Sequence, residues 1–242
     1  MKTKIALVSG GTGGIGAAIC RHLARVEYNV LVGYRSRKDE AEEFARAIGG
    51  RAIECVIDDS ASLHHARHQI DRLYGRLDLL VNNAGMTKFV AHADLDGLGD
   101  ALFDQIMAVN VRGAFASVRA FQPLLNNVDQ SVIINISSVA ARTGLGSNVA
   151  YCASKAAVDS LTRSLARALA PRIRVISVAP GLVDTDFVKN LDPAWRREQE
   201  SRTPLGRLSR PEEVAEAVVA AATMLSFSTG SIISVDGGRP LN

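Results

Sequence analysis

The 242-residue sequence has few cysteines, little net charge and no long apolar run. Its three cysteines, Cys20, Cys55 and Cys152, are widely spaced and lack the paired spacing of metal sites. The formal net charge is +3 and the basic residues are scattered, which argues against a nucleic-acid-binding protein. No apolar run reaches membrane-spanning length, and residues 1–4 lead into a short strand instead of a signal peptide. We therefore expect a cytoplasmic, reduced protein that binds neither nucleic acid nor membrane.

Apolar residues, by contrast, are plentiful. They make up 47% of the chain, enough to bury a large core within one domain of this length. Short apolar runs alternate with helical patterns, and no linker, repeat or low-complexity segment interrupts them. This alternation predicts an α/β fold, a right-handed, doubly wound parallel sheet of the Rossmann type with helices on both faces. We expect a single domain over residues 1–242, with a nucleotide at the carboxyl edge of the sheet.

A glycine-rich loop follows the first predicted strand, Ile5–Val8. The spacing is Gly10-x-x-x-Gly14-x-Gly16, and a helical pattern starts at Ala17. Glycines between a strand and a helix let the backbone approach a pyrophosphate, which the helix N-terminus attracts. The spacing differs from the G-x-G-x-x-G fingerprint, and a flexible turn is the alternative. With a strand before it and a helix after it, the loop favours dinucleotide binding.

The end of the second predicted strand, 30–33, bears on the choice of dinucleotide. NAD sites place a carboxylate here for the ribose 2′-hydroxyl, whereas NADP sites use arginine. No acid occurs before Asp39, and Arg35 is in position to meet a 2′-phosphate. We therefore favour NADP(H) over NAD(H). Ser36 could also cap the next helix ahead of Asp39.

A tyrosine and a lysine four residues apart, Tyr151 and Lys155, share one face of a predicted helix. A phenol has a pKa of about 10, so proton transfer near neutrality needs a reduction of about 3, or about 4 kcal/mol. One ammonium at about 4 Å and an effective dielectric constant of about 20 contributes that much. Ser138 lies thirteen residues upstream, after the apolar strand 132–136. Two exposed side chains on an ordinary helix are the alternative.

With these motifs in this order, the sequence resembles the short-chain dehydrogenase/reductase family from Ile5 to Gly238. Its length, glycine motif and site residues are similar to those of 3-oxoacyl-(acyl carrier protein) and acetoacetyl-CoA reductases. The resemblance implies hydride transfer between NADP(H) and a carbonyl/alcohol pair. It implies that Tyr151 donates the proton, that Ser138 holds the carbonyl oxygen and that Lys155 lowers the tyrosine pKa and binds the nicotinamide ribose. Asn110, in a predicted long helix, would help to hold a water that continues the proton relay.

The same resemblance implies a set of cofactor-binding residues at the ends of the strands. Two of them, Tyr151 and Lys155, also belong to the catalytic set. The others are Gly10, Thr12, Gly13, Gly14 and Ile15; Tyr34, Arg35 and Ser36; Ile57, at the end of a third strand expected over 52–57; Asn83, Ala84 and Gly85; and Pro180, Gly181, Val183 and Thr185.

Two further regions have less specific patterns. Residues 186–206 are polar and irregular, which is typical of a mobile lid over a substrate. His64 and His68 lie four apart on a predicted helix, a spacing that could bind metal. No third ligand stands out, so we favour an ordinary surface helix and expect no metal. The resemblance also implies a homotetramer, paired through the long helices and through the C-terminal helix and strand.

The substrate prediction depends on two loops. The loop 143–148 consists of small residues, which predicts an open pocket for a 3-oxoacyl (β-keto) thioester or ester. Arg172 and Arg174 could dock an acidic carrier protein, but the loop 126–131 contains an acid and no cation. We therefore expect little dependence on a carrier. The alternatives are a dehydrogenase of another secondary alcohol (cyclic, sugar or steroid-like), an NAD-linked dehydrogenase working in the oxidative direction, and a non-catalytic NADP-binding regulator.

Overall fold

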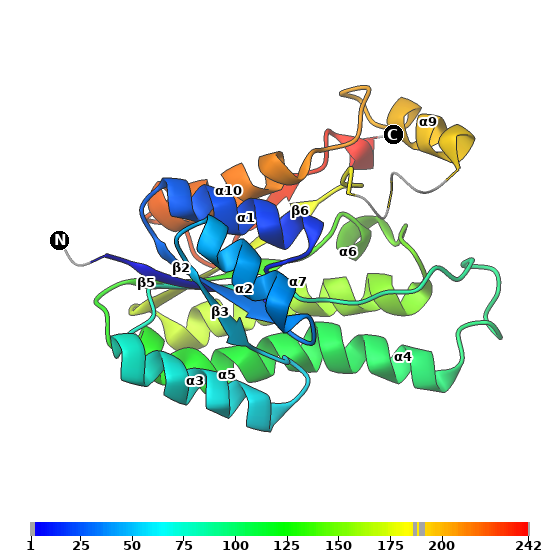
Figure 1. The fold of residues 1–242 in the computed structure, drawn as a ribbon. Coiled ribbons are helices and arrows are strands. Elements are labelled where there is room, and N and C mark those ends of the chain that lie inside the picture. Colours follow the sequence, from blue (N-terminus) through cyan, green and yellow to red (C-terminus); the bar gives the residue numbers. More distant parts are fainter. Residues whose placement is uncertain (1–2, 186–187, 189–191, 242) are drawn as a thin grey trace.

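The structure is a computed structural model that describes residues 3–185, 188 and 192–241 (Figure 1). Its centre is one parallel sheet of seven strands in the order β3-β2-β1-β4-β5-β6-β7. The strands are β1 (Ile5–Val8), β2 (Asn29–Tyr34), β3 (Arg51–Glu54), β4 (Leu79–Asn82), β5 (Ser131–Ile136), β6 (Ile173–Pro180) and β7 (Ile232–Val235). The order reverses between β1 and β4, as in a doubly wound sheet. The predicted fold class is confirmed.

Helices cover both faces of this sheet (Figure 1). One layer consists of α1 (Gly14–Arg25), α2 (Lys38–Ala47) and α10 (Pro211–Thr223). The other contains α3 (Ser60–Tyr74), α4 (Asp100–Met107), α5 (Ala114–Leu125) and α7 (Val149–Leu169). The smaller elements are the π-helical segment η1 (Ala108–Gly113), α6 (Ala140–Thr143), α9 (Pro193–Ser201) and the 3₁₀ turn η2 (Arg239–Leu241). In the described part of the chain, no helix is long and apolar enough to cross a membrane.

The alternation of strand side chains divides the interior into two hydrophobic cores. Successive residues of a strand point to opposite faces, so both faces of these strands must be apolar. On β1, Val8 packs in the core under α1 and α10, together with Ile19. Its neighbour Leu7 packs in the opposite core with Phe121 of α5. These continuous apolar strands are therefore buried on both faces.

Three local predictions were wrong. The third strand ends at Glu54, not at residue 57: its register with β2 ends where Glu54 pairs with Tyr34, and the amide of Cys55 makes a further hydrogen bond to Tyr34 O at 2.8 Å. Ser36 does not cap α2, since the helix begins at Lys38 after Arg37 and has no side-chain cap. The region 186–206 is not irregular throughout: α9 begins after Asp192, whose Oδ1 accepts from the amide of Ala194 at 2.7 Å.

All strands are parallel, so their carboxyl ends meet at one edge of the sheet. The glycine loop follows β1 at this edge, and the segments after β2 and β4 begin beside it. Ser138 comes two residues after β5, Gly181 directly after β6 and Asp236 directly after β7. The topology therefore gathers the loops predicted to carry function along a single edge.

Candidate active site

A cleft of about 570 Å³ opens at this edge, where the strand order reverses. Most of the predicted cofactor-binding residues line it. The lining residues are Gly10, Thr12, Gly13, Gly14, Ile15, Gly16, Tyr34, Arg35, Ser36, Arg37, Cys55, Val56, Ile57, Asp58, Asn83, Ala84, Gly85, Met86, Val109 and Thr185. Of the expected Pro-Gly turn, only Thr185 reaches this lining. Pro180 ends β6, and Gly181 is tied to β7 by a hydrogen bond from its amide to Val235 O at 3.0 Å. Val183 forms a bridge with Ser209.

Two loops are joined at the floor of the cleft by buried polar groups. The hydroxyl of Ser9 is 1% exposed and accepts from the backbone amides of Asn83 and Ala84, both at 3.1 Å. In return, Asn83 Nδ2 donates to the carbonyls of Ser9 and Gly10, both at 3.0 Å. Gly10 has a φ of +63°, which favours glycine, and a Cβ there would lie 3.1 Å from Ala84 Cα. The close approach of these loops therefore requires Gly10.

The start of α1 fits the pyrophosphate of a dinucleotide. Its N-cap, Gly13, makes no side-chain cap, and the first turn contains no acid. The first amides of a helix have no intrahelical partner, so those of Gly14 and Ile15 can bind an anion in the cleft. The helix dipole adds positive potential at the same place.

The end of β2 brings cations to the other end of this cleft. Arg35 is exposed, lines the cleft and has no ion-pair partner among the described residues. Arg37 lines it too, although its guanidinium also pairs with Glu40 at 2.8 Å. Sequence reasoning missed Arg37, Asp58 and Met86 as lining residues. Each of the three directly follows a residue that the sequence had predicted to bind the cofactor, and this adjacency was the available signal.

Tyr151 is held in the first turn of α7 by a helix cap. The side chain of Asn148 accepts from the Tyr151 amide at 2.7 Å, and its Nδ2 donates to Lys88 O at 2.7 Å. Asn148 is only 1% exposed, so the cap also joins the loop after β4 to the start of α7. Sequence reasoning did not single out Asn148. An asparagine directly before the first residue of a helix is a recognisable N-cap signal, because its side chain can accept from the amide of the third helical residue.

Ser138, Tyr151 and Lys155 come together as predicted, but their electrostatics differ from the expectation. Burial raises the pKa of Tyr151, and a hydrogen bond with Ser138 opposes that increase. The Lys155 ammonium lies 5.6 Å from the centroid of the tyrosine ring and donates to Ile136 O at 2.8 Å. It is therefore directed at a backbone carbonyl, and the expected reduction of the tyrosine pKa is not found. Burial lowers the pKa of Lys155 itself to about 8.

Asn110 lies in η1, where the predicted regular helix widens into a π-helical turn. Such turns are frequent at functional sites. Its side-chain oxygen accepts from Met86 N at 2.8 Å, while Nδ2 donates to Met86 O and to Ser154 Oγ, both at 3.0 Å. Ser154 Oγ in turn donates to Tyr151 O at 2.7 Å. Asn110 therefore connects the loop after β4 to the helix that carries Tyr151.

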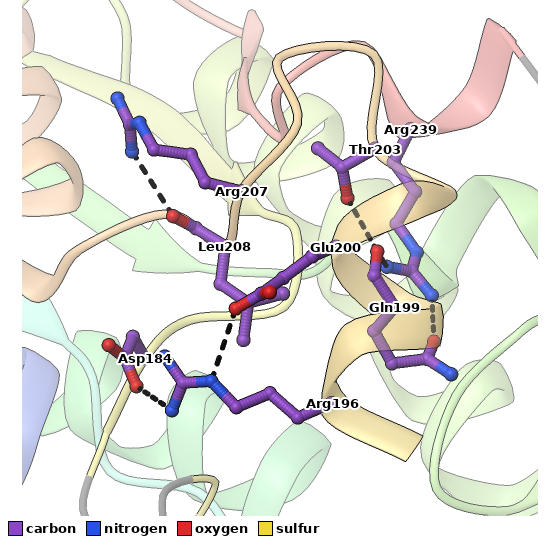
Figure 2. A network of polar contacts seen from close by, with 8 residues as sticks. All are labelled: Asp184, Arg196, Gln199, Glu200, Thr203, Arg207, Leu208 and Arg239. Atoms are coloured by element: carbon purple, nitrogen blue, oxygen red, sulfur yellow. Dashed lines mark hydrogen bonds and ion pairs between the residues drawn. The ribbon is translucent and has the colours of Figure 1, made fainter. Parts of the chain in front are cut away.

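The helix α9 is attached to the site at two points (Figure 2). Arg196 donates to Asp184 at 2.8 Å and to Glu200 at 3.1 Å, and these bonds raise its pKa. Asp184 immediately precedes the cleft residue Thr185. Further along α9, Gln199 accepts two hydrogen bonds from Arg239 in the C-terminal turn. Of the predicted lid, residues 186–187 and 189–191 lie outside the described residues.

Two other predicted features lie away from the cleft. Arg174 cannot present its cation to a carrier protein, because its guanidinium donates to the carbonyls of Ala221, Ala222, Leu225 and Ser228 at the end of α10. This occupancy removes Arg174 as one of the two cations that could have docked a carrier. His64 and His68 lie on α3, as expected. Over the described ranges, no group of three or more metal-binding side chains occurs.

Comparisons with known proteins support the same interpretation. The model of the family described as Enoyl-(Acyl carrier protein) reductase matches residues 10–239. The chain is 33% identical to the 3-oxoacyl-(acyl carrier protein) reductase FabG of Thermotoga maritima, with 98% of each chain covered. It is 35% identical to FabG of Aquifex aeolicus, again with 98% of each covered. The RhlG/NADP active-site complex of Pseudomonas aeruginosa superposes with a TM-score of 0.91 at 31% identity, covering 98% of this chain and 96% of that one. The chain therefore belongs to the short-chain dehydrogenase/reductase family and is an oxidoreductase of CH–OH and carbonyl groups.

Proposed function

We propose that this protein is an NADP(H)-dependent reductase of 3-oxoacyl thioesters or esters. The observation that carries the proposal is the proximity of the Ser138 and Tyr151 hydroxyls, with Lys155 one turn further along α7, at the carboxyl edge that holds the dinucleotide cleft. A hydroxyl and a phenol that meet in this way can hold one carbonyl oxygen between them. The relatives named FabG, which are 3-oxoacyl reductases, support this choice of substrate class.

The protonation state of Tyr151 suits it to donate the proton in a reduction. Because burial raises its pKa, the phenol keeps its proton at neutral pH. A protonated phenol can donate to a carbonyl oxygen, which is the proton transfer that reduction requires. When bound, the reduced nicotinamide supplies the hydride. Ser138 orients the carbonyl oxygen by hydrogen bonding, and Tyr151 donates the proton to it.

Lys155 and Asn110 support this proton donor. The pKa of Lys155, about 8, leaves the amine mostly protonated at neutral pH but able to give up its proton. We propose that it returns the proton to Tyr151 and also binds the nicotinamide ribose. Asn110 holds Met86 and Ser154 in place, and we propose that it helps to position the water that completes the relay.

The preference for NADP(H) is part of the proposal. Arg35 lies at the end of β2 without an ion-pair partner among the described residues, and Ser36 and Arg37 flank it. A guanidinium binds a 2′-phosphate through charge-assisted hydrogen bonds, whereas a 2′-hydroxyl gains little from it. The NADP complex of the relative RhlG agrees with this choice.

We also propose a cytoplasmic homotetramer with little dependence on a carrier protein. The three cysteines are free and buried, as in a reducing compartment. Large apolar side chains are exposed on α4 and α5 (Phe103, Phe115) and between α10 and β7 (Met224, Phe227). The two sets lie on different parts of the chain, which suits two self-association surfaces. The guanidinium of Arg174 is engaged by carbonyls at and after the end of α10, which removes one possible contact for an acidic carrier.

The test is the initial rate of NADPH consumption with three groups of substrates. They are acetoacetyl thioesters and 3-oxo esters, cyclic or steroid ketones, and sugar carbonyls. We expect reduction of the first group, and at least a hundredfold loss of kcat in the Tyr151→Phe variant, because general acid catalysis contributes about 10²–10⁴-fold. Activity on the second or third group alone would contradict the substrate class. Binding of NADPH without turnover of any substrate would indicate a regulator.

A further inference from the structure

A second cleft, of about 310 Å³, lies at the same edge of the sheet. It begins at Val139, the residue after Ser138, and it continues to the C-terminal turn. Val139 is fixed by a hydrogen bond from its amide to Pro180 O at 2.8 Å. The lining residues are Val139, Arg142, Thr143, Leu145, Arg239 and Pro240. This cleft therefore starts at the residue that follows Ser138, whose hydroxyl is proposed to hold the substrate carbonyl.

Two arginines from distant parts of the chain line this cleft together. Arg142 belongs to α6, which follows β5, whereas Arg239 begins η2, which follows β7. The two strand ends are brought close through β6, which pairs with β5 on one side and with β7 on the other. Two guanidinium groups that share a small cleft repel each other, unless a negative charge lies between them.

That negative charge is not supplied by the described residues. None of the six lining residues is acidic, and neither arginine forms an ion pair within the described ranges. Arg142 is exposed, and its side chain makes no hydrogen bond to a described residue. Arg239 is half-buried and, among the described residues, its side chain donates only to neutral oxygens of Gln199, one of them the backbone carbonyl at 3.2 Å (Figure 2). Burial and the nearby charge of Arg202 lower the pKa of Arg239, as expected where positive charge is uncompensated.

We propose that Arg142 and Arg239 form a subsite for an anionic group of the substrate, a carboxylate or a phosphate, remote from the reacting carbonyl. The proposal rests on the proposed reductase function and narrows it to substrates that carry such a group. Guanidinium groups bind both anions through paired, charge-assisted hydrogen bonds. The exposed side chain of Leu145, at the rim, provides apolar contact for the chain that joins the anion to the carbonyl.

Two pairs of substrates separate the sources of the anion. The 1-monoethyl ester of 3-oxoadipate has a carboxylate at the far end of its acyl chain, whereas the diethyl ester is neutral. Acetoacetyl-CoA has phosphates on its thiol side, whereas acetoacetyl-N-acetylcysteamine has none. The variants are Arg142→Gln and Arg239→Gln. The matched control is Arg51→Gln, an exposed arginine at the amino end of the edge strand β3.

We expect the wild type to prefer the anionic member of at least one pair by about tenfold in kcat/KM. Each cleft variant should reduce that preference about fivefold or more, mainly through KM, because a charge-assisted hydrogen bond accounts for about tenfold and solvent weakens it. Turnover of the neutral member should stay within about twofold, and Arg51→Gln should match the wild type. Unchanged preference in both cleft variants would overturn the subsite and leave the reductase function standing.

Two controls distinguish anion binding by Arg239 from a purely structural role of this side chain. Gln199→Ala removes the side-chain acceptor of Arg239 but keeps the backbone acceptor at residue 199 and the charge of Arg239, so it should preserve the preference. If it abolishes the preference as Arg239→Gln does, the role of Arg239 is only to hold α9. Calorimetric titration with monoethyl adipate, which has no ketone, measures the subsite without turnover. Binding that the two arginine variants weaken would support the subsite even if no ketone is reduced, whereas no binding and no preference would overturn it.

Discussion

Gly16→Ala tests the close approach on which the dinucleotide cleft depends. Gly16 is the third residue of α1 and is buried. A Cβ at this position would lie 2.2 Å from Gly10 O and 2.7 Å from Asn83 Nδ2. Neither atom can move freely, because they form a hydrogen bond to each other at 3.0 Å. The added methyl group must therefore separate the glycine loop from the loop after β4.

The magnitude follows from three contributions. Overpacking costs about 2 kcal/mol, and loss of the two hydrogen bonds from Asn83 Nδ2 costs about 1 kcal/mol each. Alanine is better than glycine inside a helix by about 1 kcal/mol, which offsets part of this. The free energy of unfolding should fall by about 3 kcal/mol, and for a chain of this size Tm should fall by about 6–12 °C. Because both displaced loops line the cleft, the Kd for NADPH should rise at least about tenfold.

Thermal unfolding followed by circular dichroism, with and without NADPH, measures both effects. At 100 times its Kd, the cofactor should stabilise the wild type by about 2.7 kcal/mol, and much of that gain should disappear in Gly16→Ala. The control is Gly99→Ala, because Gly99 lies at the start of a helix, as its N-cap, but has no atom within 4 Å of an added Cβ. Alanine is less favourable than glycine at an N-cap, so the free energy of unfolding of this control should fall by no more than about 1 kcal/mol. A Gly16→Ala variant that melts and binds NADPH like the wild type would refute this packing argument.

Three other predictions concern charge and assembly. Arg35→Asp should lower kcat/KM with NADPH about tenfold or more, because it removes the cation opposite the 2′-phosphate. If the variant has the same kinetics as the wild type with NADPH and also with NADH, Arg35 is only a surface charge. Lys155 has a folded pKa of about 8, below its ordinary value of 10.5, so the folded state binds fewer protons between those values and gains stability as pH rises. In urea titrations, the free energy of unfolding of the wild type should therefore rise relative to Lys155→Met by roughly 1–3 kcal/mol from pH 8 to pH 10, and parallel pH profiles would show that Lys155 is not desolvated. Light scattering at micromolar concentration should give the mass of a tetramer, and replacement of the fully exposed Phe227 by Ser should weaken the assembly; a wild-type monomer would contradict it.

The sequence alone determined the features that depend on local spacing. The apolar run of β1, the glycines after it and the helical pattern of α1 predict a strand–loop–helix unit, because each reflects a property of adjacent residues. The spacing of Tyr151 and Lys155 predicts one shared helix face for the same reason. Parallel connections of one hand then place Ser138 and the glycine loop at the same edge of the sheet. These predictions required no knowledge of contacts between distant residues.

Only the tertiary structure decided the direction in which several of these side chains point and what they meet. Lys155 donates to Ile136 O, nineteen residues earlier in the chain, so burial instead of an adjacent ammonium governs the pKa of Tyr151. In the sequence, Arg174 is a cation that could dock an acidic partner. In the structure, its guanidinium donates to carbonyls at the end of α10, about fifty residues away. Arg142 and Arg239 carry no motif, and they share a cleft because β6 lies between β5 and β7. Side-chain hydrogen bonds, burial and uncompensated charge arise from packing between distant segments, and local pattern does not specify that packing.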